Sequence, residues 1–113
     1  MAVSLNGATD NFGGAIAYEA LAVSTSVKVL TADKYRWVGA NGEQVEAREI
    51  LLTVEATNAL RYTLDGTDPV ATTTGHLLAG SGSMVVKGYQ NIAKLKMIRE
   101  GASDANIKVT YFG

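Results

Sequence analysis

The sequence predicts an all-β fold: an antiparallel two-sheet sandwich, jelly-roll-like, with about eight short strands and an extended N-terminal arm. Three observations support this prediction. Apolar and polar residues alternate in short runs, turn signals recur roughly every 10 residues, and no stretch has the strand–helix–strand pattern of a parallel sheet. We divide the chain into an arm over residues 1–20 and a single β-sandwich domain over residues 21–113.

The N-terminal arm is predicted because its apolar residues follow neither a strand period nor a helix period. Asn6-Gly7 and Gly13-Gly14 also interrupt it. The alternative interpretation is a disordered tail. We expect instead that the arm lies on a neighbouring subunit, and we take as interface candidates four apolar residues at or near the arm, together with an aromatic residue further along: Phe12, Ile16, Tyr18, Leu21 and Trp37.

The first half of the sandwich begins with two short strands, around Val27–Val29 and over residues 35–38, which we interpret as a first hairpin or corner before the Asn41-Gly42 turn. Residues 43–48 are compatible with a helical turn. A strand is predicted from about Arg48, because Ile50, Leu52 and Val54 then share one face.

The second half continues the alternation. The break at Asn58 predicts a hairpin between the strand that carries Val54 and the strand that begins near Leu60. Further strands are expected around residues 84–87, 93–99 and 105–112. In the last of these, the residues of one face are all apolar: Ala105, Ile107, Val109 and Tyr111.

Composition excludes several classes of function. The 113 residues include 10 Lys plus Arg against 11 Asp plus Glu, without a basic run, so we expect neither a nucleic-acid partner nor a charged membrane surface. The chain has 0 Cys, which excludes disulfides, thiolate metal sites and thiol nucleophiles. No apolar run reaches the ~18 residues of a membrane span, and no signal peptide is evident, so we expect a soluble, unexported protein.

Residues with catalytic or metal-binding chemistry are few. His76 is the single histidine, and no Gly-x-Ser-x-Gly motif accompanies it, so we expect no enzyme activity. Asp65 and Asp68 could offer oxygens to Ca²⁺, but turn chemistry explains them better. We therefore expect no cofactor and no metal, and predict a structural turn with positive φ at Gly66, formed by Asp65, Gly66, Asp68 and Pro69.

A carbohydrate-binding module is the alternative from a different class of protein. Tyr35 with Trp37, or Tyr111 with Phe112, could form a flat aromatic platform for sugar rings, although aromatic residues at strand spacing more often fill cores or interfaces. In addition, residues 62–69 resemble a hairpin in small β domains appended to chitin-degrading enzymes.

Residues 60–78, read with the strands predicted over 84–87, 95–99 and 109–112, resemble a group of small structural proteins of tailed bacteriophages. The resemblance covers roughly the C-terminal half. It implies a capsid decoration, or cement, protein on the capsid exterior of the virion, made in the host cytoplasm. The implied partners are the major capsid protein and further copies of the chain in a dimer or trimer. A head-to-tail joining or tail accessory protein is the alternative within the virion.

Overall fold

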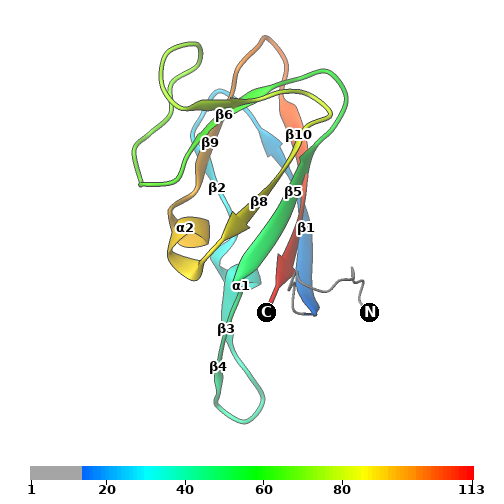
Figure 1. The fold of residues 1–113 in the computed structure, drawn as a ribbon, viewed down its shortest axis with the longest axis vertical. Coiled ribbons are helices and arrows are strands. Elements are labelled where there is room, and N and C mark those ends of the chain that lie inside the picture. The colour runs from blue at the N-terminus through cyan, green and yellow to red at the C-terminus, as the bar shows by residue number, and fades with distance from the viewer. Residues whose placement is uncertain (1–13) are drawn as a thin grey trace.

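The structure is a computed structural model that describes residues 14–113, and it consists of two four-stranded antiparallel sheets with a small hairpin beside them (Figure 1). The first sheet has the order β1 (Ala15–Val23), β10 (Ala105–Phe112), β5 (Glu49–Val54) and β8 (Ser83–Lys87). The second has the order β2 (Lys28–Val29), β9 (Lys96–Arg99), β6 (Leu60–Thr63) and β7 (His76–Leu78). The hairpin pairs β3 (Arg36–Val38) with β4 (Gln44–Glu46).

The connections make this sandwich a jelly roll. The chain changes sheet between β1 and β2, between β5 and β6, and at each connection from β7 to β10: β7 to β8, β8 to β9, and β9 to β10. Only β6 and β7 follow one another within a sheet of the sandwich, and the β3–β4 hairpin is inserted where the chain returns from β2 to β5. The predicted fold class, an antiparallel jelly-roll-like sandwich, is therefore confirmed.

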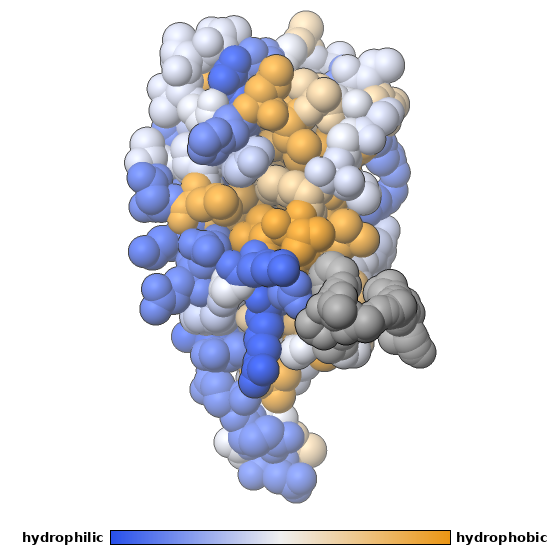
Figure 2. All heavy atoms as spheres, in the orientation of Figure 1, coloured by the Kyte–Doolittle hydropathy of each residue, from blue (hydrophilic) through white to orange (hydrophobic). Residues whose placement is uncertain are grey.

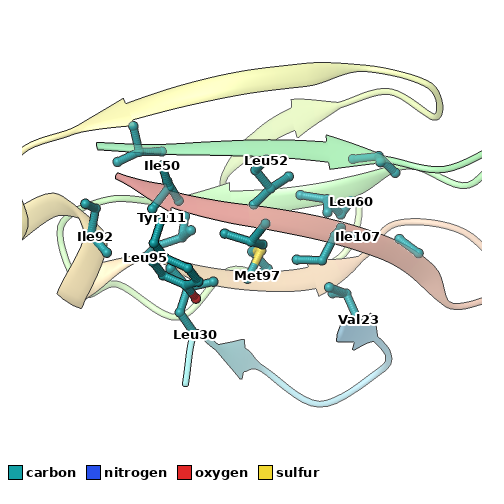
Figure 3. Packing of buried hydrophobic residues seen from close by; sticks show 14 of the residues in the cluster. Val23, Leu30, Ile50, Leu52, Leu60, Ile92, Leu95, Met97, Ile107 and Tyr111 are labelled. Atoms are coloured by element: carbon teal, nitrogen blue, oxygen red, sulfur yellow. The ribbon is translucent and has the colours of Figure 1, made fainter. Parts of the chain in front are cut away.

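The core lies between the two sheets and is built by period-2 alternation (Figure 3). In β10 the side chains of Ile107, Val109 and Tyr111 are fully buried, and in β5 those of Ile50 and Leu52 are. Leu60 and Met97 face them from the second sheet, also fully buried. Each such side chain contributes on the order of 1.5–3 kcal/mol to the free energy of unfolding, so this layer is the main source of stability.

Two local predictions were wrong. The break at Asn58 does not form a hairpin, because β5 pairs with β10 and β8, whereas β6 pairs with β9 and β7 in the other sheet. Residues 44–46 form β4 rather than a helical turn, because Trp37 and Val45 pair across the Asn41-Gly42 turn. Gly42 has φ +84°, which is why a glycine suits that turn.

Two short helices were not predicted. The first, α1 (Ala32–Tyr35), leads directly into β3, and the second, α2 (Tyr89–Lys94), lies between β8 and β9. The α2 helix buries only Ile92 against the core. A one-turn or two-turn helix with one buried residue leaves no 3.6-residue period in the sequence.

The boundary of the N-terminal arm also needs correction. Residues 15–20 belong to β1, which pairs with β10 from Ala15↔Phe112 to Val23↔Ala105. The segment is therefore part of the sandwich and not an arm. The remainder of the predicted arm, residues 1–13 with Phe12, lies outside the described residues.

Candidate interaction surface

The predicted turn forms as expected at its first two residues. Gly66 has φ +90°, and the carboxylate of Asp65 accepts a hydrogen bond from the Thr67 backbone N–H at 3.0 Å. That bond from Thr67 is the main reason that the pKa of Asp65 lies below its ordinary value. Pro69 is fully buried and anchors the loop.

Asp68 has a different role from the one predicted. Its carboxylate accepts a hydrogen bond from Lys96 Nζ at 2.7 Å and so ties the loop to β9. Within residues 14–113, no group of three or more acidic or histidine side chains is placed to hold a metal ion. In this structure Asp65 orders the turn through the Thr67 N–H, and Asp68 joins the loop to β9 through Lys96.

His76 lies at a hollow of about 610 Å³ between the turn, the start of β7 and α2. Its ring contacts Tyr62, with 5.4 Å between ring centroids. The hollow brings together His76, Asp65 and five further residues, none of which is a serine or an aromatic residue: Thr63, Leu64, Thr67, Gly75 and Asn91. The arrangement thus has neither a serine nucleophile for His76 nor a flat platform for a sugar ring.

The aromatic pairs proposed for sugar binding are separated by the fold. Tyr111 is fully buried in the core, so Tyr111 and Phe112 point to opposite faces of β10. Tyr35 packs against the core and its ring meets the Tyr89 ring edge-on, with 5.9 Å between ring centroids. Neither pair forms a flat exposed platform.

The interface candidates divide into two groups. Ile16 and Leu21 are half-buried and pack against the core. Tyr18 is 54% exposed on β1, while Trp37 is half-buried in the β3–β4 hairpin beside Val38, which is 65% exposed. In Figure 1 this hairpin projects beyond the end of the two sheets. Tyr18 and the hairpin are therefore the accessible members of the predicted set.

Apolar residues form a row across the outer face of the first sheet. Strand register places Tyr18 of β1 beside Thr110 of β10, Thr110 beside Leu51 of β5, and Leu51 beside Val85 of β8. Leu51 is 36% exposed and Val85 is 43% exposed. We call these four residues the outer row. In Figure 2, apolar atoms gather in a band across the middle of the visible face.

Charged pairs flank the outer row on both sides. Glu49 and Lys87, the next register pair on the same face of the sheet, approach to 4.0 Å. On the opposite side, the Lys108 ammonium forms an ion pair with the Glu55 carboxylate, and this bond raises the pKa of Lys108 above its ordinary value. An apolar centre with a polar and charged rim is the usual anatomy of a protein–protein interface.

The second sheet offers no comparable surface. Its exposed apolar residues Leu77 and Val29 lie on β7 and β2, which are the opposite edges of the sheet. The loop over residues 64–75, which connects β6 to β7, is held to the sheet because Arg61 donates a hydrogen bond to the Gly75 carbonyl at 2.9 Å. The first sheet therefore carries the candidate interaction surface.

Sequence reasoning identified Tyr18 but missed Leu51 and Val85. Both lie on strands whose other face is buried, so alternation alone marks them as solvent-facing positions. Apolar residues at solvent-facing positions mark a possible interaction surface when strand register aligns several of them. That register joins residues far apart in the sequence and becomes visible only in the structure.

Comparison with protein-family models, with curated proteins and with solved structures found no match to this chain. Within residues 14–113, no helix is long and apolar enough to cross a membrane.

Proposed function

We propose that this chain is a structural protein of a tailed-bacteriophage virion, a capsid decoration protein that binds across major capsid subunits and stabilises the head. The observation that carries the proposal is the outer row, an apolar surface with a charged rim on an open sheet face. Such a surface suits attachment to another protein, and the resemblance of residues 60–112 to phage structural proteins supplies the partner.

The fold is compatible with this proposal by analogy. Jelly rolls recur in viral capsid domains, although they also recur in lectins. The hollow at His76 lacks an aromatic lining residue, which favours protein binding over sugar binding. Attachment across a junction between capsid subunits would hold neighbouring subunits together, and many copies per head would make the combined effect large.

Heads assembled without this chain provide the direct test. Purified protein is mixed with such heads, and bound protein is measured by co-sedimentation. We expect Leu51→Lys to reduce binding at least tenfold, because it places a charge at the centre of the outer row. The matched control is Leu77→Lys, which adds the same charge at a 55%-exposed leucine of the second sheet and is expected to bind as the wild type does.

Three results would contradict the proposal. One is wild-type protein that does not sediment with heads, and another is equal loss of binding in both variants. The third is antibody labelling of virions that marks the tail or the head–tail junction, which would support a joining or tail accessory protein instead. A glycan array tests the rival from the other class, because saturable binding to one glycan that is lost in His76→Ala would favour a carbohydrate-binding module.

A further inference from the structure

The outer edge of β1 has backbone groups without a partner in the described part of the chain. Within residues 14–113, β1 pairs only with β10 and forms one end of its sheet. The Glu55 N–H donates to the Asn106 carbonyl at 2.9 Å, so Asn106 directs its backbone groups toward β5. Backbone direction alternates along an antiparallel strand, so the neighbouring odd-numbered residues of β10 direct theirs toward β1.

This alternation fixes which residues of β1 direct their backbone groups away from the sheet. Glu19 and Leu21 lie opposite Val109 and Ile107, so they exchange hydrogen bonds with β10. Beyond the register shift between Ala15 and Ala17, the even-numbered residues of β1 direct their backbone N–H and C=O groups away from the sheet: Tyr18, Ala20 and Ala22. No backbone bond of these three to a residue outside the β1–β10 ladder occurs within residues 14–113. The result is an open template for another strand.

The other three edges are protected in the ways that natural proteins use. The β2 edge has only 2 residues and the β7 edge only 3. The β8 edge has 5 residues and ends in Lys87. In contrast, β1 has 9 residues with no Lys, Arg or Pro. Short length, charge, proline and β-bulges discourage pairing between sheet edges. The register shift of β1 is confined to Ala15–Ala17, and from Ala17 to Val23 the strand has no proline and a single charged residue, Glu19.

The single charge of β1 is turned away from the open edge. Glu19 accepts hydrogen bonds from the Tyr111 hydroxyl and from the Thr31 hydroxyl, the latter at 2.6 Å, and both donors belong to this chain. The outward-facing residues are uncharged, and Ala20 and Ala22 are small and exposed. A second strand can therefore approach closely and meets no unpaired charge.

We propose that two copies of this chain associate through β1 of each, antiparallel about a two-fold axis, so that their first sheets join into one continuous sheet. The edge is complementary to itself, because uncharged residues meet uncharged residues when β1 pairs with its own copy. One possible register places Glu19 opposite Glu19 of the second copy. This register is disfavoured, because two negative charges would then lie side by side. Pairing centred on Tyr18 avoids this and joins the two outer rows end to end.

The dimer deepens the proposed function, because it doubles the apolar surface available to a capsid. A seam of one strand from each copy falls below the ~1,600 Å² of a standard interface, so we expect a dimer that dissociates on dilution. Binding of several dimers to one capsid would then raise the effective strength of attachment. The test is made in solution without capsids, so its failure is distinguishable from failure of the proposed function.

Sedimentation equilibrium over a range of concentrations tests the dimer with the full-length chain. We expect the wild type to pass from monomer to dimer as concentration rises, and Ala20→Lys to remain monomeric because it places a charge at the seam. The control is Ser83→Lys, which adds the same charge to β8 at the opposite edge of the sheet. Strand register aligns Ser83 with Ala20 across the sheet. This variant should dimerise like the wild type. Melting temperatures of both variants establish that the fold is retained.

Crosslinking gives an independent readout, because the chain has 0 Cys and any introduced cysteine is unique. With a short bismaleimide, Tyr18→Cys should give a covalent dimer, and Ser83→Cys should not. A wild type that stays monomeric at millimolar concentration would overturn the proposal. So would an Ala20→Lys variant that dimerises normally, or crosslinking at residue 83 in place of residue 18.

Discussion

The hydroxyl of Tyr111 donates a hydrogen bond to the carboxylate of Glu19, and this bond joins the buried face of β10 to the edge strand β1. Burial, followed by the bond to Glu19, raises the pKa of Tyr111 well above its ordinary value, so the hydroxyl stays protonated and remains a donor. Glu19 also accepts a bond from the Thr31 backbone N–H at 3.1 Å. One carboxylate thus connects β1, β10 and the start of α1.

We predict that Tyr111→Phe lowers the free energy of unfolding by about 1.5–3 kcal/mol, because it removes a hydrogen bond to a charged group. Chemical denaturation measures the change. The control is Tyr62→Phe, which removes a hydroxyl with no hydrogen bond to the described residues and should cost less than the first variant. Equal effects in the two variants would contradict a specific role for the Tyr111–Glu19 bond.

A substitution at Gly66 tests the stability cost of backbone strain alone, without a contribution from steric crowding. A Cβ at Gly66 would meet nothing within 4 Å, so the cost of Gly66→Val comes from its φ of +90°. We expect a loss of about 1 kcal/mol or more. Gly101→Val is the matched control, because Gly101 also has open space around it but lacks a positive φ. If both denaturation midpoints fell equally, the assignment of strain to Gly66 would be wrong.

Strand alternation predicted the buried faces well and failed at β1, and the reason lies in its residues. The side chains of Tyr18, Ala20 and Ala22 lie on the solvent side of β1, while those of Ala17, Glu19 and Leu21 lie on the side of the core, and Ile16, at the register shift, also packs against the core. The apolar residues are on both faces and the single charge points inward, so no alternation is visible in the sequence. Glu19 is acceptable there only because Tyr111 and Thr31 supply donors.

Strand pairing was harder to predict than strand position. A short connection such as that at Asn58 looks the same whether the chain returns within its sheet or crosses to the other one, as it does between β5 and β6. The turn at Asp65 and Gly66, by contrast, depends only on local residue chemistry and was therefore predictable. The outer row was not, because Tyr18, Leu51 and Val85 meet only through the register of four strands.

The ion pair between Arg61 and Glu100 predicts a specific response to acid. Arg61 Nε donates to the Glu100 carboxylate at 2.8 Å, and this bond, followed by the bond from the Thr72 N–H, lowers the pKa of Glu100. A lowered pKa in the folded state stabilises the fold above the pKa of the unfolded chain, near ~4.3, and that stabilisation is lost as pH falls through the folded value.

We therefore expect Glu100→Gln to lower the melting temperature at pH 7 and to have a smaller effect as pH falls toward 3, because the stabilisation from the wild-type carboxylate is progressively lost on acidification. Melting curves across this range measure the difference. The control is Glu46→Gln on β4, an exposed carboxylate without an ion pair to the described residues. A melting-temperature difference that stays constant from pH 7 to pH 3 would show that the Glu100 carboxylate does not titrate as inferred.

Chelation tests the predicted independence from metal. Because Asp68 is engaged with Lys96 and Asp65 with the Thr67 N–H, we expect EDTA to leave the melting temperature unchanged. Differential scanning calorimetry with and without EDTA measures this. A reproducible fall that Ca²⁺ reverses would establish a calcium site, and loss of that response in Asp65→Asn would locate it.

Because β1 begins at Ala15, two N-terminal truncations should differ in their effect on stability. Deleting residues 2–13 leaves β1 entire, including the bond from the Gly113 N–H to the Gly14 carbonyl at 3.1 Å. Deleting residues 2–18 removes that bond, Ile16 and the first part of the ladder to β10. We expect the first truncation to melt near the wild-type temperature and the second to melt several degrees lower, since buried apolar area and ladder bonds are both lost.

The shorter truncation also isolates the predicted role of the N-terminal segment in attachment. If residues 2–13 contact a neighbouring subunit or the capsid, their deletion should reduce occupancy on heads while the fold is retained, with occupancy measured by co-sedimentation. Normal loading of this truncated protein would remove the attachment role from the segment and leave the outer row as the binding surface. A truncated protein that failed to fold would instead show that residues 2–13 are needed by the sandwich itself, contrary to an arm.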